Sequence, residues 1–132
     1  MKVKFRTMII MKDVHKTYPN GVTAINGIDV QINSGEFVYI VGPSGAGKST
    51  FIRLIYREEV PSKGEIIINS QNVNDLKDRE IPYLRRQIGV VFQDFKLLPR
   101  LTVYENVAFA LEVIEESPQN IRNRVMEVLD LV

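Results

Sequence analysis

Residues 40–50 read IVGPSGAGKST. Three glycines and a proline follow a run of apolar residues, and a lysine and two hydroxyl residues, Ser49 and Thr50, come directly after them. From Gly42 to Ser49 the stretch matches the spacing G-x-x-x-x-G-K-[ST]. Glycines allow the main chain to curl until successive N–H groups converge on one concavity, which is a site for an anion. The stretch therefore predicts a loop that binds phosphate groups.

The flanks of this loop have the patterns that such a site needs. The preceding residues, Phe37 to Val41, are nearly all apolar and predict a strand buried on both faces, as in a parallel sheet. From Ser49 to Arg57 apolar and basic residues alternate at helical spacing, and a helix that begins here adds unpaired N–H groups and its positive dipole end. Lys48 could reach the β- and γ-phosphates, and the Ser49 hydroxyl could ligate Mg²⁺. A glycine-rich turn without a ligand is the alternative, and the loop alone does not separate nucleotide kinases, GTPases and ATPases.

The composition is that of an ordinary soluble domain. The chain has 132 residues, of which 45% are hydrophobic and 25% charged, with a net charge of +1. This balance gives no reason to expect a nucleic-acid partner. The absence of cysteine excludes disulfides and thiolate metal sites. No run of about 18 apolar residues is present, so we expect any work at a membrane to depend on another protein.

The first two thirds of the chain read as short strands and helices separated by turns. The YPNG turn at Tyr18–Gly21 separates the first two predicted strands. Residues Asp78–Gln87 predict a helix, provided that Pro82 falls in its first turn. The remaining predicted strands are Met8–Val14, Val22–Ile32, Glu65–Asn69 and, as a second buried strand, Ile88–Phe92.

The last third predicts two helices. Thr102 can cap the first, with Glu105 three residues later, and Ser117-Pro118 can start the second. The apolar stripes that these helices would bury are Val103, Val107, Leu111 and Ile114 in the first, and Ile121, Val125, Val128, Leu129 and Val132 in the second. Because the second stripe runs to the final residue without a stop signal, we interpret the sequence as truncated.

Two of these stretches resemble a known family. GPSGAGKST resembles the Walker A loop of ABC-type ATPases, and IGVVFQDFKLLPRLTVYENVAFAL (Ile88–Leu111) resembles their Q-loop and the entry to their helical subdomain. The resemblance implies an α/β class P-loop NTPase fold that is incomplete here. It would comprise an N-terminal antiparallel β part, a partial RecA-like core and the start of the helical subdomain. Residues 1–132 would then be the N-terminal portion of one nucleotide-binding domain, with a core to about residue 94 and the helical part from about 95 to 132.

The resemblance also assigns roles to residues. Tyr18 would stack on adenine, and Gln93 would be the Q-loop glutamine that touches Mg²⁺ or the attacking water. Ser49 and Gln93 would be the protein ligands of Mg²⁺, and Lys48 would supply charge to the phosphates of ATP. The loop residues expected to bind ATP are Gly42, Pro43, Ser44, Gly45, Ala46, Gly47, Lys48, Ser49 and Thr50. The alternative for Tyr18 is a turn tyrosine that packs on its own hairpin. The alternative for Gln93 is a polar residue that ends a strand.

Within the family, the sequence is most similar to the cell-division branch. The stretches that carry this similarity are FVYIVGPSGAGKSTFIRLIYRE, PYLRRQIGVVFQDFKLLP and TVYENVAFALEVI. This implies an ATP-binding subunit that dimerises with its own copy and drives an integral-membrane partner from the cytoplasmic face of the bacterial plasma membrane. An ATPase subunit of a lipoprotein-release or macrolide-export transporter is an alternative. A small nucleotide kinase and a nucleotide-binding fragment without catalysis are two others.

Hydrolysis needs groups that we do not find in the sequence. The reaction requires a positioned water, a base or orienting group, and stabilisation of the transition-state charge. In the family that the sequence resembles, these groups come from a Walker B strand ending in Asp-Glu, an LSGGQ-like signature and a switch histidine. Here no run of four apolar residues is followed by Asp-Glu, and no Ser-Gly-Gly occurs. The single histidine, His15, lies far from where the family has its switch histidine. The catalytic set is incomplete, with only Lys48 and Gln93 present. We therefore expect weakened nucleotide binding and little or no turnover.

Overall fold

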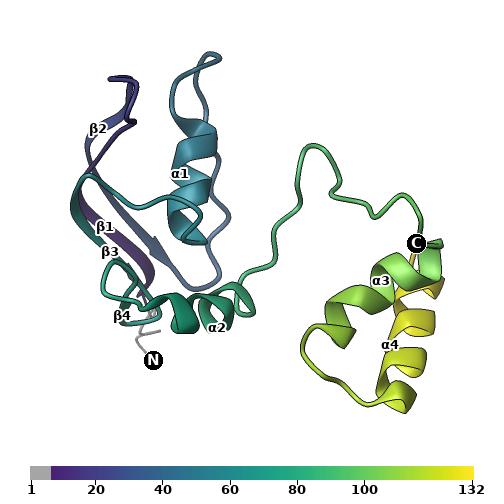
Figure 1. The fold of residues 1–132 in the computed structure, drawn as a ribbon. Helices are drawn as coiled ribbons and strands as arrows, with labels where there is room; N and C mark the ends of the chain where they lie inside the picture. The colour runs from purple at the N-terminus through teal and green to yellow at the C-terminus, as the bar shows by residue number, and fades with distance from the viewer. Residues whose placement is uncertain (1–6) are drawn as a thin grey trace. The chain divides into compact units, whose positions relative to one another are not determined.

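The computed structural model describes residues 7–132, so the basic start of the predicted domain lies outside the described residues. The chain forms two compact units, one ending at Gly89 and the other spanning Val90–Val132 (Figure 1). Each unit is described by itself. The expected division near residue 94 into a nucleotide-binding core and a helical part stays a prediction.

The first unit is built on an antiparallel sheet with the strand order β2-β1-β3-β4. The long strands β1 (Thr7–Thr17) and β2 (Thr23–Asn33) form a hairpin around the predicted YPNG turn. On its other side β1 pairs with β3 (Lys63–Ile68), which pairs with the short β4 (Gln71–Asn72). The structure thus confirms the predicted antiparallel β part.

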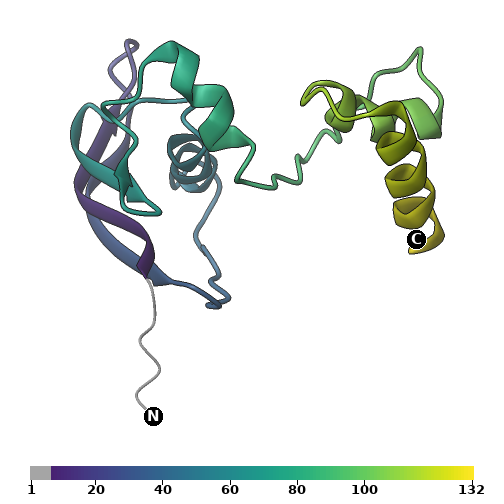
Figure 2. The ribbon, with the colours of Figure 1, turned by 90° about the horizontal axis from the view of Figure 1, so that it is seen from below.

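One helix covers a face of this sheet. Helix α1 (Lys48–Ile55) follows the glycine-rich loop and lies against the strands (Figures 1 and 2). Its Leu54 is fully buried together with Val14 of β1 and Ile66 of β3. Burial of side chains of this size stabilises the fold by about 1.5–3 kcal/mol each, so this core fixes α1 on the sheet.

The predicted helix at residues 78–87 is shorter than expected. A 3₁₀ turn at Asp78–Glu80 leads into α2 (Ile81–Arg85), whose Leu84 is buried in the same core. Pro82 lies in the first turn of α2, where its missing N–H would have no helical acceptor. The proline therefore does not interrupt the helix.

Two predicted strands are wrong. Residues 37–41 and 88–92 belong to no strand, and side chains such as Phe37, Val41 and Val91 are 82%, 86% and 99% exposed. A buried parallel strand exists only where a neighbouring strand takes up its N–H and C=O groups. Every strand of the described sheet is antiparallel, and neither segment pairs with it. Both apolar segments are therefore irregular backbone without a sheet partner among the described residues.

The second unit is a pair of packed helices, α3 (Val103–Glu112) and α4 (Pro118–Asp130), which lie side by side (Figures 1 and 2). Both predicted caps are confirmed, because the Thr102 and Ser117 hydroxyls accept hydrogen bonds from the N–H groups of Glu105 and Asn120. Within the described part of the chain, no helix has the length and apolar character needed to cross a membrane.

The predicted apolar stripes are correct only in part. Val125 of α4 is fully buried, but the buried residue of α3 is Ala108, whereas Val103 is 70% exposed. The prediction for Val132 is wrong, because α4 ends at Asp130 and Val132 is fully exposed.

Candidate functional site

The glycine-rich loop is open at its surface and continues directly into α1. Pro43, Ser44, Gly45 and Ala46 are exposed, and Gly47 is the N-cap residue of the helix. Gly45 has a φ of +80°, and a Cβ added there would meet nothing within 4 Å. The loop thus has room beside its backbone for a ligand that main-chain N–H groups could bind.

The first turn of α1 is suited to an anion. It contains no acidic residue, and no side chain of the described residues hydrogen-bonds to the helix at its N-cap. Lys48 and Ser49 begin the helix, with Ser49 exposed. Because the N–H groups of a first helical turn have no acceptor within the helix, this end can bind a negatively charged group.

Gly47 explains how the loop is held on the sheet. Its φ is +84°, and a Cβ at this position would lie 2.2 Å from the carbonyl oxygen of Ala24 in β2. Only glycine allows this approach, so the loop touches the backbone of β2 where the helix begins. The position of the phosphate-binding turn is therefore set by the β1–β2 hairpin.

The Lys48 side chain folds back over the start of the loop. Its Nζ donates hydrogen bonds to the carbonyl oxygens of Gly42 at 2.7 Å and Pro43 at 2.6 Å. These contacts close the loop around a cation that has three donors and no acceptor. The arrangement places a positive charge in the loop.

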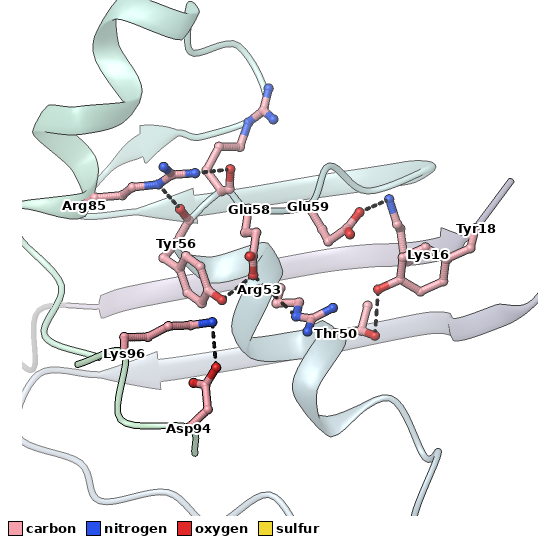
Figure 3. Close-up of polar contacts among 11 residues, drawn as sticks. Lys16, Tyr18, Thr50, Arg53, Tyr56, Glu58, Glu59, Arg85, Asp94 and Lys96 are labelled. Carbon is pink, nitrogen blue, oxygen red and sulfur yellow. Dashed lines mark hydrogen bonds and ion pairs between the residues drawn. The ribbon is translucent and has the colours of Figure 1, made fainter. Parts of the chain in front are cut away.

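The predicted base-stacking residue lies beside the same helix. Tyr18 follows the end of β1, and its backbone bonds with Val22 and Gly21 close the turn of the hairpin. Its Oη is 3.1 Å from the Oγ1 of Thr50, a hydroxyl in the first turn of α1 that is 7% exposed (Figure 3). The structure thus brings Tyr18 and the end of the loop together across 32 residues of sequence.

This contact also involves the hydroxyl of Thr50. Thr50 is one of the loop residues predicted to bind ATP, and its hydroxyl is buried and bonded to Tyr18. Its part in binding ATP stays a prediction. A tyrosine that packs only on its own hairpin would not bond to α1, so the geometry favours Tyr18 as part of the site. The stacking role itself stays a prediction.

Gln93 lies in the other unit. It is exposed and sits in a turn in which the Phe95 N–H donates to the Phe92 carbonyl. Beside it, the Lys96 ammonium is 2.7 Å from Asp94, and this contact lowers the pKa of the Asp94 carboxyl. Ser49 and Gln93 belong to different units, and the pair of Mg²⁺ ligands stays a prediction.

An open cavity of about 510 Å³ adjoins the loop, between β2 and residues 38–41. Its lining includes Ile28, Val30 and Phe51 as well as Gly47 and Lys48. An apolar lining does not match a triphosphate, which needs N–H groups and cations. We therefore locate the candidate phosphate site at the loop and not in this cavity.

Sequence reasoning missed the ion pair between Lys16 and Glu59, whose lysine lies beside Tyr18. The Lys16 ammonium is 2.7 Å from the Glu59 carboxylate and 5.0 Å from the centre of the Tyr18 ring (Figure 3). The alternation of side chains along a strand could have indicated that Lys16 lies on the same side as Tyr18, because residues two apart share a face of the sheet.

Comparisons with known proteins agree with this geometry. The model of the ABC transporter family matches residues 25–132. The chain is 70% identical over 125 residues to the cell division ATP-binding protein FtsE of Bacillus subtilis, which covers 95% of this chain and 55% of that protein. It is 44% identical to the methionine import ATP-binding protein MetN of Helicobacter acinonychis, covering 95% of this chain and 38% of that protein. The chain thus spans about half the length, or less, of these curated relatives.

Solved structures of ATP-binding cassettes share the fold. A dimeric post-hydrolysis state of the cassette MJ0796, bound to ADP and Pi, superposes with a TM-score of 0.84 at 40% identity and covers 93% of this chain and 56% of that one. The structure of cbiO1 from Clostridium perfringens, which is part of the ABC transporter complex cbiONQ, superposes with a TM-score of 0.82 at 31% identity, covering 95% of this chain and 50% of that one. The predicted fold class is confirmed.

Proposed function

Since the chain belongs to the ABC transporter family, we propose that it holds ATP through the loop Gly42–Thr50, with the adenine stacked on Tyr18. The observation that carries this proposal is the 3.1 Å contact between Tyr18 and Thr50. It links the base platform to the first turn of the phosphate-binding helix. The β1–β2 hairpin would thereby bind the base of the nucleotide, and the loop with α1 would bind its phosphates.

The chemistry of the donor set fits a magnesium nucleotide. Backbone N–H groups of the loop and the first turn of α1 would bind phosphate oxygens. Lys48 would exchange the two carbonyl oxygens that it now contacts for phosphate oxygens, which carry more negative charge. The exposed Ser49 hydroxyl would ligate Mg²⁺, with Gln93 as the second protein ligand.

We propose that the intact protein of which this chain is a part acts as the ATPase subunit of a cell-division complex of the FtsE type. The support is the high identity to FtsE proteins from several bacteria, 70% in Bacillus subtilis and 48% in Mycobacterium tuberculosis. Two copies would pair, and an FtsX-like integral-membrane subunit would hold them at the cytoplasmic face of the plasma membrane. A transporter subunit for lipoprotein release or macrolide export is the second candidate. Co-purification of the full-length protein separates the two, because recovery of a lipoprotein transporter subunit in place of the FtsX-like one would exclude the first.

We further propose that the 132-residue chain binds ATP without hydrolysing it. Its sequence has no apolar run followed by Asp-Glu to orient an attacking water. The test is a titration with fluorescent ATP and Mg²⁺, in which phosphate release is followed in the same samples. We expect saturable binding that is lost in Lys48→Ala, with no phosphate released. Turnover that depends on Lys48 would refute the binding-only proposal, and binding unaffected by Lys48→Ala would refute the assignment of the site.

A further inference from the structure

Lys16 is an ammonium held in a protected place. The residue is 9% exposed and lies in β1, next to the turn that carries Tyr18. Its Nζ is 2.7 Å from Oε2 of Glu59 and donates to the carbonyl oxygen of Val60 at 2.9 Å. Burial of an ammonium is costly unless it is paired and hydrogen-bonded, and here both conditions are met.

The same ammonium lies over the Tyr18 ring. Its Nζ is 5.0 Å from the ring centre, within the range of about 6 Å at which a cation is attracted to an aromatic face (Figure 3). Because Glu59 and Val60 fix the ammonium, it does not move as an exposed lysine would. One face of the ring is thus occupied, and a second group can stack only on the other.

We propose that Lys16 is a positioning residue that presents one face of Tyr18 to the purine base of the bound nucleotide; this rests on the proposed function. Three contacts together fix the ring: the ammonium on one face, Thr50 at the phenol oxygen and the backbone bonds of the turn. A ring held in its binding orientation loses little freedom when the base arrives.

The charge contributes in the same direction. The face of an aromatic ring is negative, and a cation on one side draws electron density toward itself. The opposite face then repels the electron-rich face of a purine less. Glu59 has a separate part in this arrangement, since it keeps the ammonium in place and does not touch the ring in any contact of the described residues.

The test compares ATP with inorganic triphosphate, which has the phosphates but no base. The variants are Lys16→Met, which keeps the apolar stem, and Lys16→Arg, which keeps the cation. Lys12→Met is the matched control, because Lys12 lies on the same strand and its side chain is 58% exposed in a 3.7 Å ion pair with Glu65. Dissociation constants are measured for both ligands with each variant.

We expect Lys16→Met to weaken ATP binding about three- to fivefold while the affinity for triphosphate stays unchanged. Lys16→Arg should restore most of the loss, and Lys12→Met should change neither affinity. In a Tyr18→Ala background, Lys16→Met should cost nothing further. Equal losses for ATP and triphosphate would mean that Lys16 only supports the fold, and this would overturn the proposal.

A second measurement does not depend on ATP. Proton NMR should find the ε-methylene resonances of Lys16 shifted upfield by the ring current of Tyr18, and the shift should vanish in Tyr18→Ala. Absence of the shift would contradict the proposed contact. If the shift is present but wild-type protein binds neither ATP nor triphosphate, the proposed function is refuted, and with it the role of Lys16.

Discussion

Gly47 offers a sharp test of how the loop is fixed to the sheet, because Gly45 provides a matched control two residues away. Both have a left-handed φ, +84° for Gly47 and +80° for Gly45. A Cβ at Gly47 would lie 2.2 Å from the carbonyl oxygen of Ala24, whereas one at Gly45 meets nothing within 4 Å. Substitution by alanine therefore adds the same backbone strain at both sites but a collision at only one.

The magnitudes follow from these two terms. A left-handed conformation costs a non-glycine residue about 1–2 kcal/mol, and the stiffer unfolded chain returns about 0.4–1 kcal/mol. Gly45→Ala should therefore lower the free energy of unfolding by about 1 kcal/mol. Gly47→Ala carries the same strain and must also separate α1 from β2, and overpacking of this kind costs about 1–3 kcal/mol more.

Urea unfolding followed by circular dichroism measures the difference. With a slope of about 2 kcal/mol per M, the extra cost of about 1–3 kcal/mol means that Gly47→Ala should unfold at a urea concentration lower by about 0.5–1.5 M than Gly45→Ala does. Equal midpoints for the two variants would show that the contact between the loop and Ala24 does not hold α1 in place. The described anchoring of the loop would then be wrong.

Three other predictions concern caps and contacts. Thr102→Ala should destabilise α3 by about 1 kcal/mol, seen as faster hydrogen exchange of the α3 amides, and unchanged exchange would contradict the capping role. The Thr102 N–H and hydroxyl lower the pKa of Glu105. The ionised carboxylate therefore stabilises α3 at pH values above its ordinary pKa of about 4.5, and this stabilisation is lost as the pH falls through the lowered pKa. Glu105→Gln should remove this pH dependence from the helicity of α3. Tyr18→Phe removes the bond to Thr50 and should lower the free energy of unfolding by about 0.5–1.5 kcal/mol while ATP still stacks on the ring, so a loss of ATP affinity as large as that of Tyr18→Ala would refute a stacking role.

Local signals in the sequence predicted the local structure well. The Thr102 and Ser117 caps and the turn between β1 and β2 depend on residues within a few positions of each other, and all three occur as expected. The loop and α1 likewise follow from glycine spacing and helical periodicity. Such features need no knowledge of distant parts of the chain.

Features that depend on distant partners could not be predicted in this way. An apolar run at residues 37–41 has the composition of a buried strand, but composition does not supply the neighbouring strand. The bond from Tyr18 to Thr50 spans 32 residues, and the Lys16–Glu59 pair joins β1 to the segment that follows α1. Only the three-dimensional structure brings these groups together. It also revealed that Ala108 of α3, a residue too small to suggest a core position, is buried.

The most direct measurement is of the backbone N–H groups of the loop in the 132-residue chain by ¹⁵N NMR during a titration with ATP and Mg²⁺. If the loop cradles phosphate, the amide resonances from Gly45 to Ser49 should shift together and saturate, and adenosine should leave them unchanged. Those of α4 should stay where they are. Saturable ATP binding that leaves the loop amides unshifted would contradict the account, because the nucleotide would then be held elsewhere on the molecule.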